Sequence, residues 1–72
     1  MLRPMNKLPT MTPEELRAAR AEMGLTQEEA ANKYGAGLRS YKNWELGERT
    51  IPGPVVVLTR YLVDEFRKLK RY

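Results

Sequence analysis

The chain has 72 residues and a formal net charge of +4, and it contains neither cysteine nor histidine. A chain of this length makes one domain that buries only about 60% of its unfolded surface, so a dimer interface would be a natural supplement. The missing residue types exclude a disulfide framework and a thiolate zinc site and remove the commonest general base, and we expect no metal and no cofactor.

The first eleven residues show little helical pattern. They contain Pro4 and Pro9, together with the cations Arg3 and Lys7. We therefore expect residues 1–11 to form a flexible N-terminal arm ahead of a domain that spans residues 12–72. The alternative to a merely mobile arm is one whose cations touch phosphate or enter a minor groove.

The first predicted helix begins at a capping box. In Thr12-Pro13-Glu14-Glu15, the hydroxyl of Thr12 and the carboxylate of Glu15 can each satisfy a helix-end donor, and proline is allowed at the first helical position. The helix is predicted to end at Gly24. The inward stripe of this helix is predicted to consist of Leu16, Ala19 and Met23.

Residues 26–47 predict two short helices joined by a glycine turn. Thr26 and Glu29 form a second capping box, and residues 35–37 (Gly-Ala-Gly) make the bend. The second helix closes at Gly47 with a left-handed cap. One face of that helix is apolar and carries Leu38, Tyr41 and Trp44. A helix with a buried aromatic stripe and a cationic opposite face, placed after such a bend, suits the major groove of DNA.

The last predicted helix starts at Pro54 and carries one apolar stripe to its end. The stripe is broadened by Val57 and Tyr61 and consists of Val55, Leu58, Leu62, Phe66 and Leu69. A four-helix core of this size cannot cover it all. Its outer end is therefore the predicted dimer interface, formed by Leu62, Phe66 and Leu69. The alternative is that the last turns fold back or fray.

Charge and composition narrow the class of function. Residues 1–35 hold five basic and five acidic residues, and residues 36–72 hold eight basic and four acidic ones. This asymmetry favours a polyanionic partner over a basic tail that serves solubility. The longest apolar run, Val55–Leu58, is far too short to span a membrane, and we expect a cytoplasmic protein without membrane contact. No nucleophile stands with a base, so we expect no enzyme activity.

Together these motifs resemble the phage-repressor and Cro-like helix-turn-helix family, whose members are also called XRE-type regulators. The resemblance runs from Arg20 to Pro54 and is carried by Gly24-Leu25-Thr26-Gln27-Glu28-Glu29, Ala31, Gly35 and Tyr41-x-x-Trp44-Glu45-x-Gly47. It implies an all-α, compact, lambda-repressor-like bundle of four to five helices, in which a helix-turn-helix precedes a long C-terminal helix.

The resemblance also implies a function. The expected protein is a sequence-specific transcriptional regulator, namely a homodimeric repressor that binds an inverted repeat in double-stranded DNA through its third helix. Seventy-two residues leave no room for a sensing domain, so we expect no small-molecule effector. The alternative is an antitoxin-like module that neutralises a partner protein through its arm or C-terminal helix and can bind DNA as well.

Individual roles follow at the positions that match the family pattern. The base-reading positions are Leu38, Arg39 and Asn43. Arginine bridges guanine O6 and N7, asparagine pairs with adenine, and a leucine touches a thymine methyl or packs near the turn. The phosphate contacts are assigned to Gln27, Ser40, Lys42 and Arg49. For each polar residue the alternative is a solvated side chain on the outer surface.

Other matched positions have structural roles or depart from the family. Arg20 and Glu45 match an ion pair that joins the first helix to the end of the third, and Trp44 is expected in the core. Tyr41 replaces a more common aliphatic residue, so its hydroxyl must reach solvent or a partner. Gly37 stands where Ser or Thr often caps the third helix, which should therefore begin less firmly.

Overall fold

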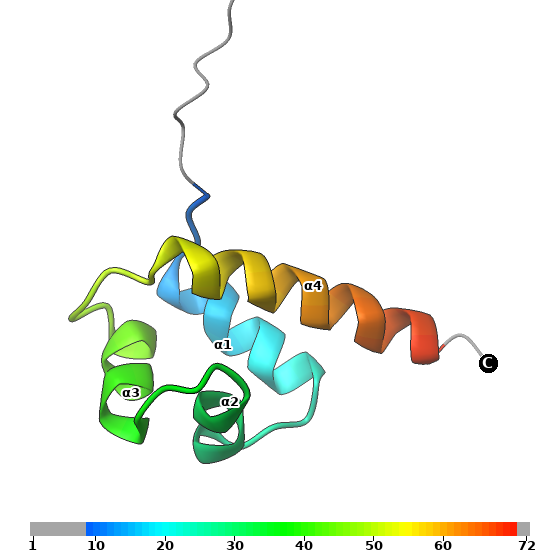
Figure 1. Ribbon diagram of the computed structural model, residues 1–72, viewed down its shortest axis with the longest axis horizontal. Helices are drawn as coiled ribbons and strands as arrows, with labels where there is room; N and C mark the ends of the chain where they lie inside the picture. The colour runs from blue at the N-terminus through cyan, green and yellow to red at the C-terminus, as the bar shows by residue number, and fades with distance from the viewer. Residues whose placement is uncertain (1–8, 71–72) are drawn as a thin grey trace, which may run out of the picture.

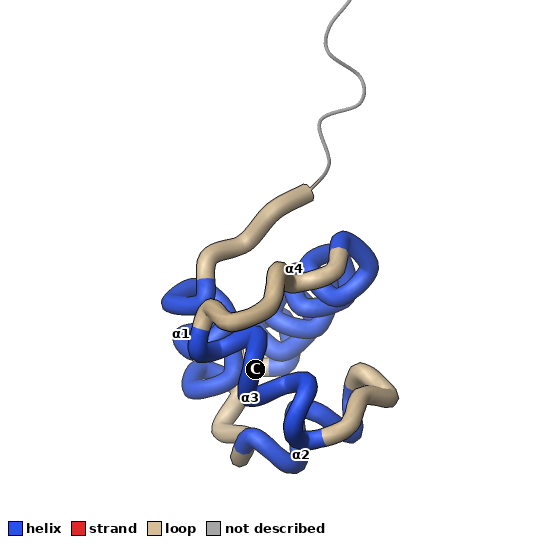
Figure 2. Tube along the Cα trace, turned by 90° about the vertical axis from the view of Figure 1, so that its left-hand side faces the viewer, coloured by secondary structure: helices blue, strands red, loops and turns tan. Residues whose placement is uncertain are grey.

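The computed structural model describes residues 9–70, which form four α-helices and no β-strand. The helices are α1 (Pro13–Glu22), α2 (Gln27–Lys33), α3 (Leu38–Leu46) and α4 (Gly53–Leu69). Figure 1 shows α4 lying across α1, with α2 and α3 below them, and α4 stays on the upper side of the molecule in the turned view of Figure 2. The predicted all-α bundle with a long last helix is confirmed.

The start of the domain is tied to α4. The carbonyl of Thr10 accepts a hydrogen bond from the Arg60 guanidinium at 2.8 Å, and Met11 packs against the core. These residues belong to the end of the expected N-terminal arm. Residues 1–8 of that arm lie outside the described residues.

Both predicted capping boxes are present. At α1, the Glu15 N–H donates to the Thr12 hydroxyl at 3.1 Å and the Thr12 N–H donates to the Glu15 carboxylate at 2.8 Å. Thr26 and Glu29 form the same reciprocal pair at the start of α2, at 3.1 and 2.9 Å. These bonds satisfy helix-end donors that have no partner inside the helix, and so fix where each helix begins.

The two ends of α3 differ. Its N-cap, Gly37, offers no side-chain hydrogen bond, whereas Gly47 closes the helix with the predicted left-handed backbone at φ = 81°. The Glu48 N–H then donates to the Asn43 carbonyl at 2.9 Å, which satisfies one of the carbonyls at the helix end.

The core lies where α1, α2 and α3 meet beneath α4. α3 contacts both α1 and α2, while α1 contacts α4. The buried residues of this cluster are Leu16, Ala30, Ala31, Tyr41, Trp44, Ile51 and Val56. The Tyr41 ring stacks on Tyr34 with centroids 6.0 Å apart and meets the edge of Trp44 at 5.9 Å. The small Ala30 and Ala31 leave the room that these three rings occupy.

The hydroxyl of Tyr41 departs from expectation. Tyr41 is fully buried, and its hydroxyl has no hydrogen-bond partner of acceptable geometry within residues 9–70. The prediction that it reaches solvent or a partner is therefore wrong. Burial raises the pKa of Tyr41 far above its usual range, and the nearby Glu45 carboxylate adds to this effect.

The core-facing side of α4 also differs from the predicted stripe. The helix begins at Gly53, one residue before the predicted start, and its buried residues are Val56, Thr59 and Val63. Partly buried side chains flank them, namely Val55, Leu58, Leu62 and Phe66. Val57 and Tyr61, which are predicted to broaden the apolar stripe, are exposed and take no part in the buried side of α4.

The burial of Thr59 explains why the buried side of α4 is rotated relative to the predicted stripe. Its hydroxyl donates to the Val55 carbonyl at 2.7 Å and lies 2.7 Å from the Tyr34 hydroxyl, so a polar residue is buried with its hydrogen bonds made. Hydropathy alone assigns a threonine to the outer face.

Among the helices of residues 9–70, none is long and apolar enough to cross a membrane.

Candidate nucleic-acid interface

α3 presents a polar, cationic side away from the core. Its inward side is fixed by the buried Tyr41 and by Trp44 and Glu45, which lie three and four positions after it. Three other side chains of α3 are exposed and form no hydrogen bond or ion pair within residues 9–70; they are Arg39, Ser40 and Lys42. Three of the predicted DNA-contacting residues are thus displayed together on one helix.

Three further predicted contacts lie elsewhere on α3 or in the loop that follows it. Leu38 is 38% exposed, whereas Tyr41 and Trp44, with which it is predicted to share an apolar face, are buried. Asn43 is partly buried, and its carbonyl is used in closing the helix. Arg49 is exposed in the loop after α3, where its backbone N–H donates to that same carbonyl at 3.3 Å.

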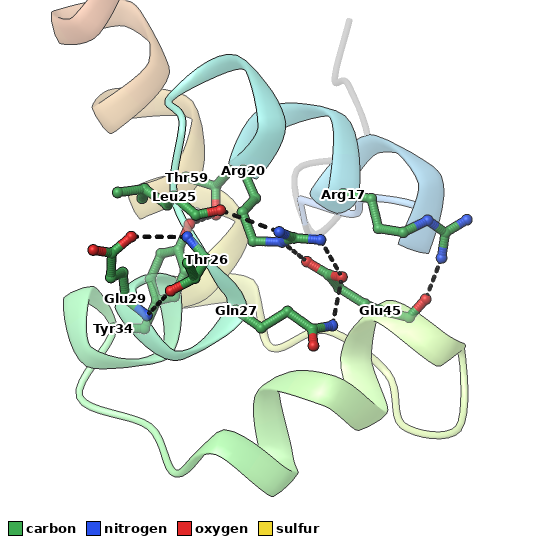
Figure 3. A network of polar contacts seen from close by, with 9 residues as sticks. All are labelled: Arg17, Arg20, Leu25, Thr26, Gln27, Glu29, Tyr34, Glu45 and Thr59. Carbon is green, nitrogen blue, oxygen red and sulfur yellow. Dashed lines mark hydrogen bonds and ion pairs between the residues drawn. The ribbon is translucent and has the colours of Figure 1, made fainter.

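Glu45 connects α3 to α1 and α2. Its carboxylate accepts two hydrogen bonds from the Arg20 guanidinium, from Nε at 2.7 Å and from Nη2 at 3.2 Å. The remaining guanidinium nitrogen, Nη1, donates to the Leu25 carbonyl at 3.1 Å. Figure 3 shows the carboxylate held between Arg20 on one side and Gln27 on the other. Arg20 and Glu45, predicted to pair, are brought together here in bidentate geometry.

The protonation of Glu45 follows from this environment. Burial would raise its pKa, but the hydrogen bonds from Arg20 and Gln27 outweigh burial and hold the pKa of Glu45 below its usual range. The same contact raises the pKa of Arg20. The pair is therefore charged at neutral pH.

Gln27 takes part in the same network. Its side-chain amide donates to the Glu45 carboxylate at 3.0 Å. An amide nitrogen carries two hydrogens, so one remains for an acceptor such as a phosphate oxygen. The predicted phosphate-contacting residue is thus held in place from within the protein.

Arg17 was missed by sequence reasoning. Its guanidinium donates to the Glu45 carbonyl, which lies in the last turn of α3 and has no partner inside the helix (Figure 3). Arg17 and Arg20 stand one turn apart on α1 and hold the backbone and the side chain of the same glutamate. No short-range signal marks Arg17, because its acceptor is a main-chain atom 28 positions away.

Leu46 was also missed. It ends α3 with 70% of its surface exposed. It lies seven positions after Arg39, which places it on the same outward side of the helix. The helical period places it on that side, but its apolar side chain gives no signal of contact with a polar partner.

Comparison with known proteins places the chain in a family. The sequence profile of a family described as "Helix-turn-helix" matches residues 16–58, which extend from α1 into α4. The chain belongs to the XRE-type helix-turn-helix family. It is thus a DNA-binding regulator. No curated protein and no solved structure matches the chain.

The outer end of α4 lies beyond this helix-turn-helix match, which ends at residue 58. In Figure 1 its C-terminal half runs past the end of α1. Leu62 and Phe66 are partly buried, whereas Leu69 is 71% exposed. All three line a groove of about 220 Å³ together with Met23 and Leu25 and with the charged Lys33 and Glu65. The residues predicted as a dimer interface therefore border one groove that is apolar with two charged residues in its lining.

Proposed function

We propose that this protein is a homodimeric repressor that reads an inverted-repeat operator, with one α3 in the major groove of each half-site. The observation that carries the proposal is the outward side of α3, where Arg39, Ser40 and Lys42 are exposed and unpaired among the described residues. Two short helices joined by a turn, with the second in the groove, are the geometry by which this motif meets DNA.

The predicted DNA-contacting residues divide into two chemical classes. The planar guanidinium of Arg39 can bridge O6 and N7 of guanine with two hydrogen bonds, and Asn43 and Leu38 are assigned to adenine and a thymine methyl. Lys42, Ser40, Arg49 and the free amide hydrogen of Gln27 are assigned to phosphates. Lysine is a point charge that suits phosphate and discriminates poorly between bases.

Two copies are needed for sufficient specificity. One recognition helix reads only a few base pairs, whereas a dimer with two-fold symmetry reads two half-sites about one helical turn apart, roughly 34–36 Å. The apolar surface at the end of α4 supports dimerisation. Repression requires no further activity, because a bound dimer excludes other proteins from the operator.

Selection of bound duplexes from a random pool tests this proposal. We expect an enriched palindrome with half-sites about one helical turn apart. A single unrepeated half-site would contradict the homodimer, and an unenriched pool would contradict sequence-specific reading. A protein that co-purifies on Phe66 and Leu69 would favour the antitoxin-like alternative.

A reporter gene then tests the direction of regulation. With the selected palindrome placed over its promoter, expression should fall when the protein is present. The matched control is the same promoter with both half-sites scrambled, which should stay unaffected. Increased expression from the intact site would contradict repression.

A further inference from the structure

The last turn of α3 has a negative electrostatic character. A helix carries partial negative charge at its C-terminal end, and the last turn of α3 has no basic side chain to offset it. Glu45 lies in this turn, Glu48 follows it, and the helix itself ends at the exposed, uncharged Leu46. DNA is a polyanion, so this end of α3 repels a phosphate unless a cation from another element lies beside it.

Arg17 supplies such a cation from α1. Its guanidinium donates from Nη1 to the carbonyl of Glu45 in the last turn of α3 (Figure 3). The side chain of Arg17 is 45% exposed, and its only other polar contact among the described residues is an ion pair with Glu14, at 3.6 Å from Nη2. A guanidinium has five N–H donors in a planar fork, so most of those of Arg17 remain free for a further acceptor.

The length of α3 brings its last turn to the DNA backbone when its first turn is in the groove. The residues at the start of a recognition helix contact base edges, and Arg39 lies in the first turn of α3. The helix has 9 residues and is therefore about 13.5 Å long. The major groove is about 12 Å wide. With Arg39 over the bases, the last turn of α3 reaches the edge of the groove, where the phosphates lie.

We propose that Arg17 contacts a DNA phosphate at this edge while it stays bonded to the Glu45 carbonyl, and so links the DNA backbone to the end of α3. This inference rests on the proposed function and adds a contact from α1 to those assigned to α2, α3 and the following loop. Gln27 bonds the carboxylate of the same glutamate from the other side (Figure 3). In this arrangement, two side chains that hold Glu45 also hold phosphates, which limits how far α3 can tilt in the groove.

Glu14 does not prevent this contact. Its side chain is 76% exposed and lies about one turn before Arg17 on α1. An exposed ion pair of this kind contributes little to stability and is screened by salt, so Arg17 can exchange Glu14 for a phosphate. A phosphate also offers the guanidinium two oxygens at once, which makes it the better acceptor.

Salt titrations of DNA binding test the inference. We expect Arg17→Gln to weaken binding to the selected operator and to random duplexes by the same factor, because a phosphate contact carries no sequence information. One phosphate contact fewer makes the slope of log affinity against log salt shallower by about 0.9. The loss of affinity should therefore be about threefold larger at ~50 mM salt than at ~200 mM.

Two matched variants separate a lost contact from other effects. Arg60 is also exposed and also donates to a main-chain carbonyl, that of Thr10, but it lies on α4, which runs above α1 while α2 and α3 lie below (Figure 1). Arg60→Gln removes the same charge and should leave the salt slope unchanged. Arg17→Lys keeps the charge and should keep the wild-type slope, because counterion release follows charge.

A second measurement uses the wild-type protein and so does not depend on the folding of any glutamine variant. The Nε–Hε NMR resonance of Arg17, assigned by its loss in Arg17→Lys, should shift when operator duplex is added. The corresponding resonance of Arg60 should stay in place. A stationary Arg17 resonance would contradict the contact.

Three results of the salt titrations would overturn the inference. An unchanged slope for Arg17→Gln, with lower thermal stability, would leave Arg17 only as a cap for the end of α3. A slope reduced equally in Arg17→Lys would attribute the effect to a distorted α3, and one reduced equally in Arg60→Gln would attribute it to net charge. In each case an enriched palindrome would leave the proposed function in place. The expected slopes with an unenriched DNA pool would instead contradict sequence-specific reading and retain the phosphate contact.

Discussion

At the scale of single residues, Arg39 is the strongest candidate for reading a base. It is exposed on α3 beyond the buried Tyr41 and Trp44, so truncation leaves the core unchanged. We predict that Arg39→Ala weakens binding to the selected operator by about 1–3 kcal/mol and relaxes preference at one base pair. Equilibrium binding to the operator and to random duplexes measures both effects. An equal loss on random DNA would reassign Arg39 to a phosphate.

Lys42 provides the contrasting case on the same helix. We predict that Lys42→Ala weakens binding to all sequences alike, because a phosphate contact carries no sequence information. The slope of log affinity against log salt should also become shallower by about 1. Salt titrations on operator and random DNA measure this slope. A loss confined to the operator would show that Lys42 contacts a base.

Tyr41 and Tyr34 form a matched pair in the core. The Tyr41 hydroxyl is buried without a partner among the described residues, whereas the Tyr34 hydroxyl lies 2.7 Å from that of Thr59. Tyr41→Phe should therefore keep or raise the free energy of unfolding, by up to about 1–3 kcal/mol. Tyr34→Phe should lower it by about 1 kcal/mol. Denaturant unfolding compares the two, and a destabilised Tyr41→Phe would reveal a hydrogen bond to Glu45.

At the scale of helices, the angle of α3 depends on Glu45. Its carboxylate binds Arg20 and Gln27, and its carbonyl binds Arg17. We predict that Glu45→Gln lowers the free energy of unfolding by about 3 kcal/mol, because the guanidinium of Arg20 is left partly buried without its counter-charge. Specific DNA affinity should fall with it. The control Glu48→Gln, in the exposed loop, should change neither quantity.

The same network predicts a dependence on pH. The pKa of Glu45 is lower in the folded protein than in the unfolded chain, where it is about 4.3. Its stabilising contribution is therefore complete above that value and is lost as pH falls through the folded pKa. The difference in unfolding free energy between wild type and Glu45→Gln should shrink between pH 7 and pH 3. A constant difference would show that the charge of Glu45 is not what stabilises α3.

The predictability of each element follows the range of its interactions. The starts of α1 and α2 and the end of α3 are predicted correctly, because Thr12, Thr26 and Gly47 act on atoms within a few residues. The buried side of α4 is not predicted correctly, since the burial of Thr59 depends on Tyr34, which lies 25 positions earlier. Local patterns cannot supply such partners.

The candidate site shows the same division. The helical period distinguishes the exposed Arg39 and Lys42 from the buried Trp44. The family pattern adds the pairing of Arg20 with Glu45, but it gave no indication of Arg17, whose partner is a main-chain oxygen. Which exposed residue contacts which base depends on the sequence of the bound DNA, and the protein sequence does not contain that information.

At the scale of the whole molecule, DNA affinity is tied to assembly. We predict that Phe66→Asp yields a monomer, because a charge would be buried between Leu62 and Leu69 in the proposed dimer interface at the end of α4. Operator affinity should fall by about 10²–10⁴-fold as bivalent binding is lost. Sedimentation and operator titration measure the two effects. Tyr61→Asp is the control and should remain dimeric, and an unchanged Phe66→Asp dimer would place the interface elsewhere.

The anchoring of α3 from behind has an evolutionary consequence. Its inward residues, with Arg17 and Arg20, fix the pose of the helix, while Arg39, Ser40 and Lys42 carry no internal hydrogen bond or ion pair among the described residues. Substitutions at such surface positions change the free energy of unfolding little. DNA specificity can therefore evolve through single substitutions at these positions while the fold is kept. A different specificity can be engineered onto the same fold in the same way.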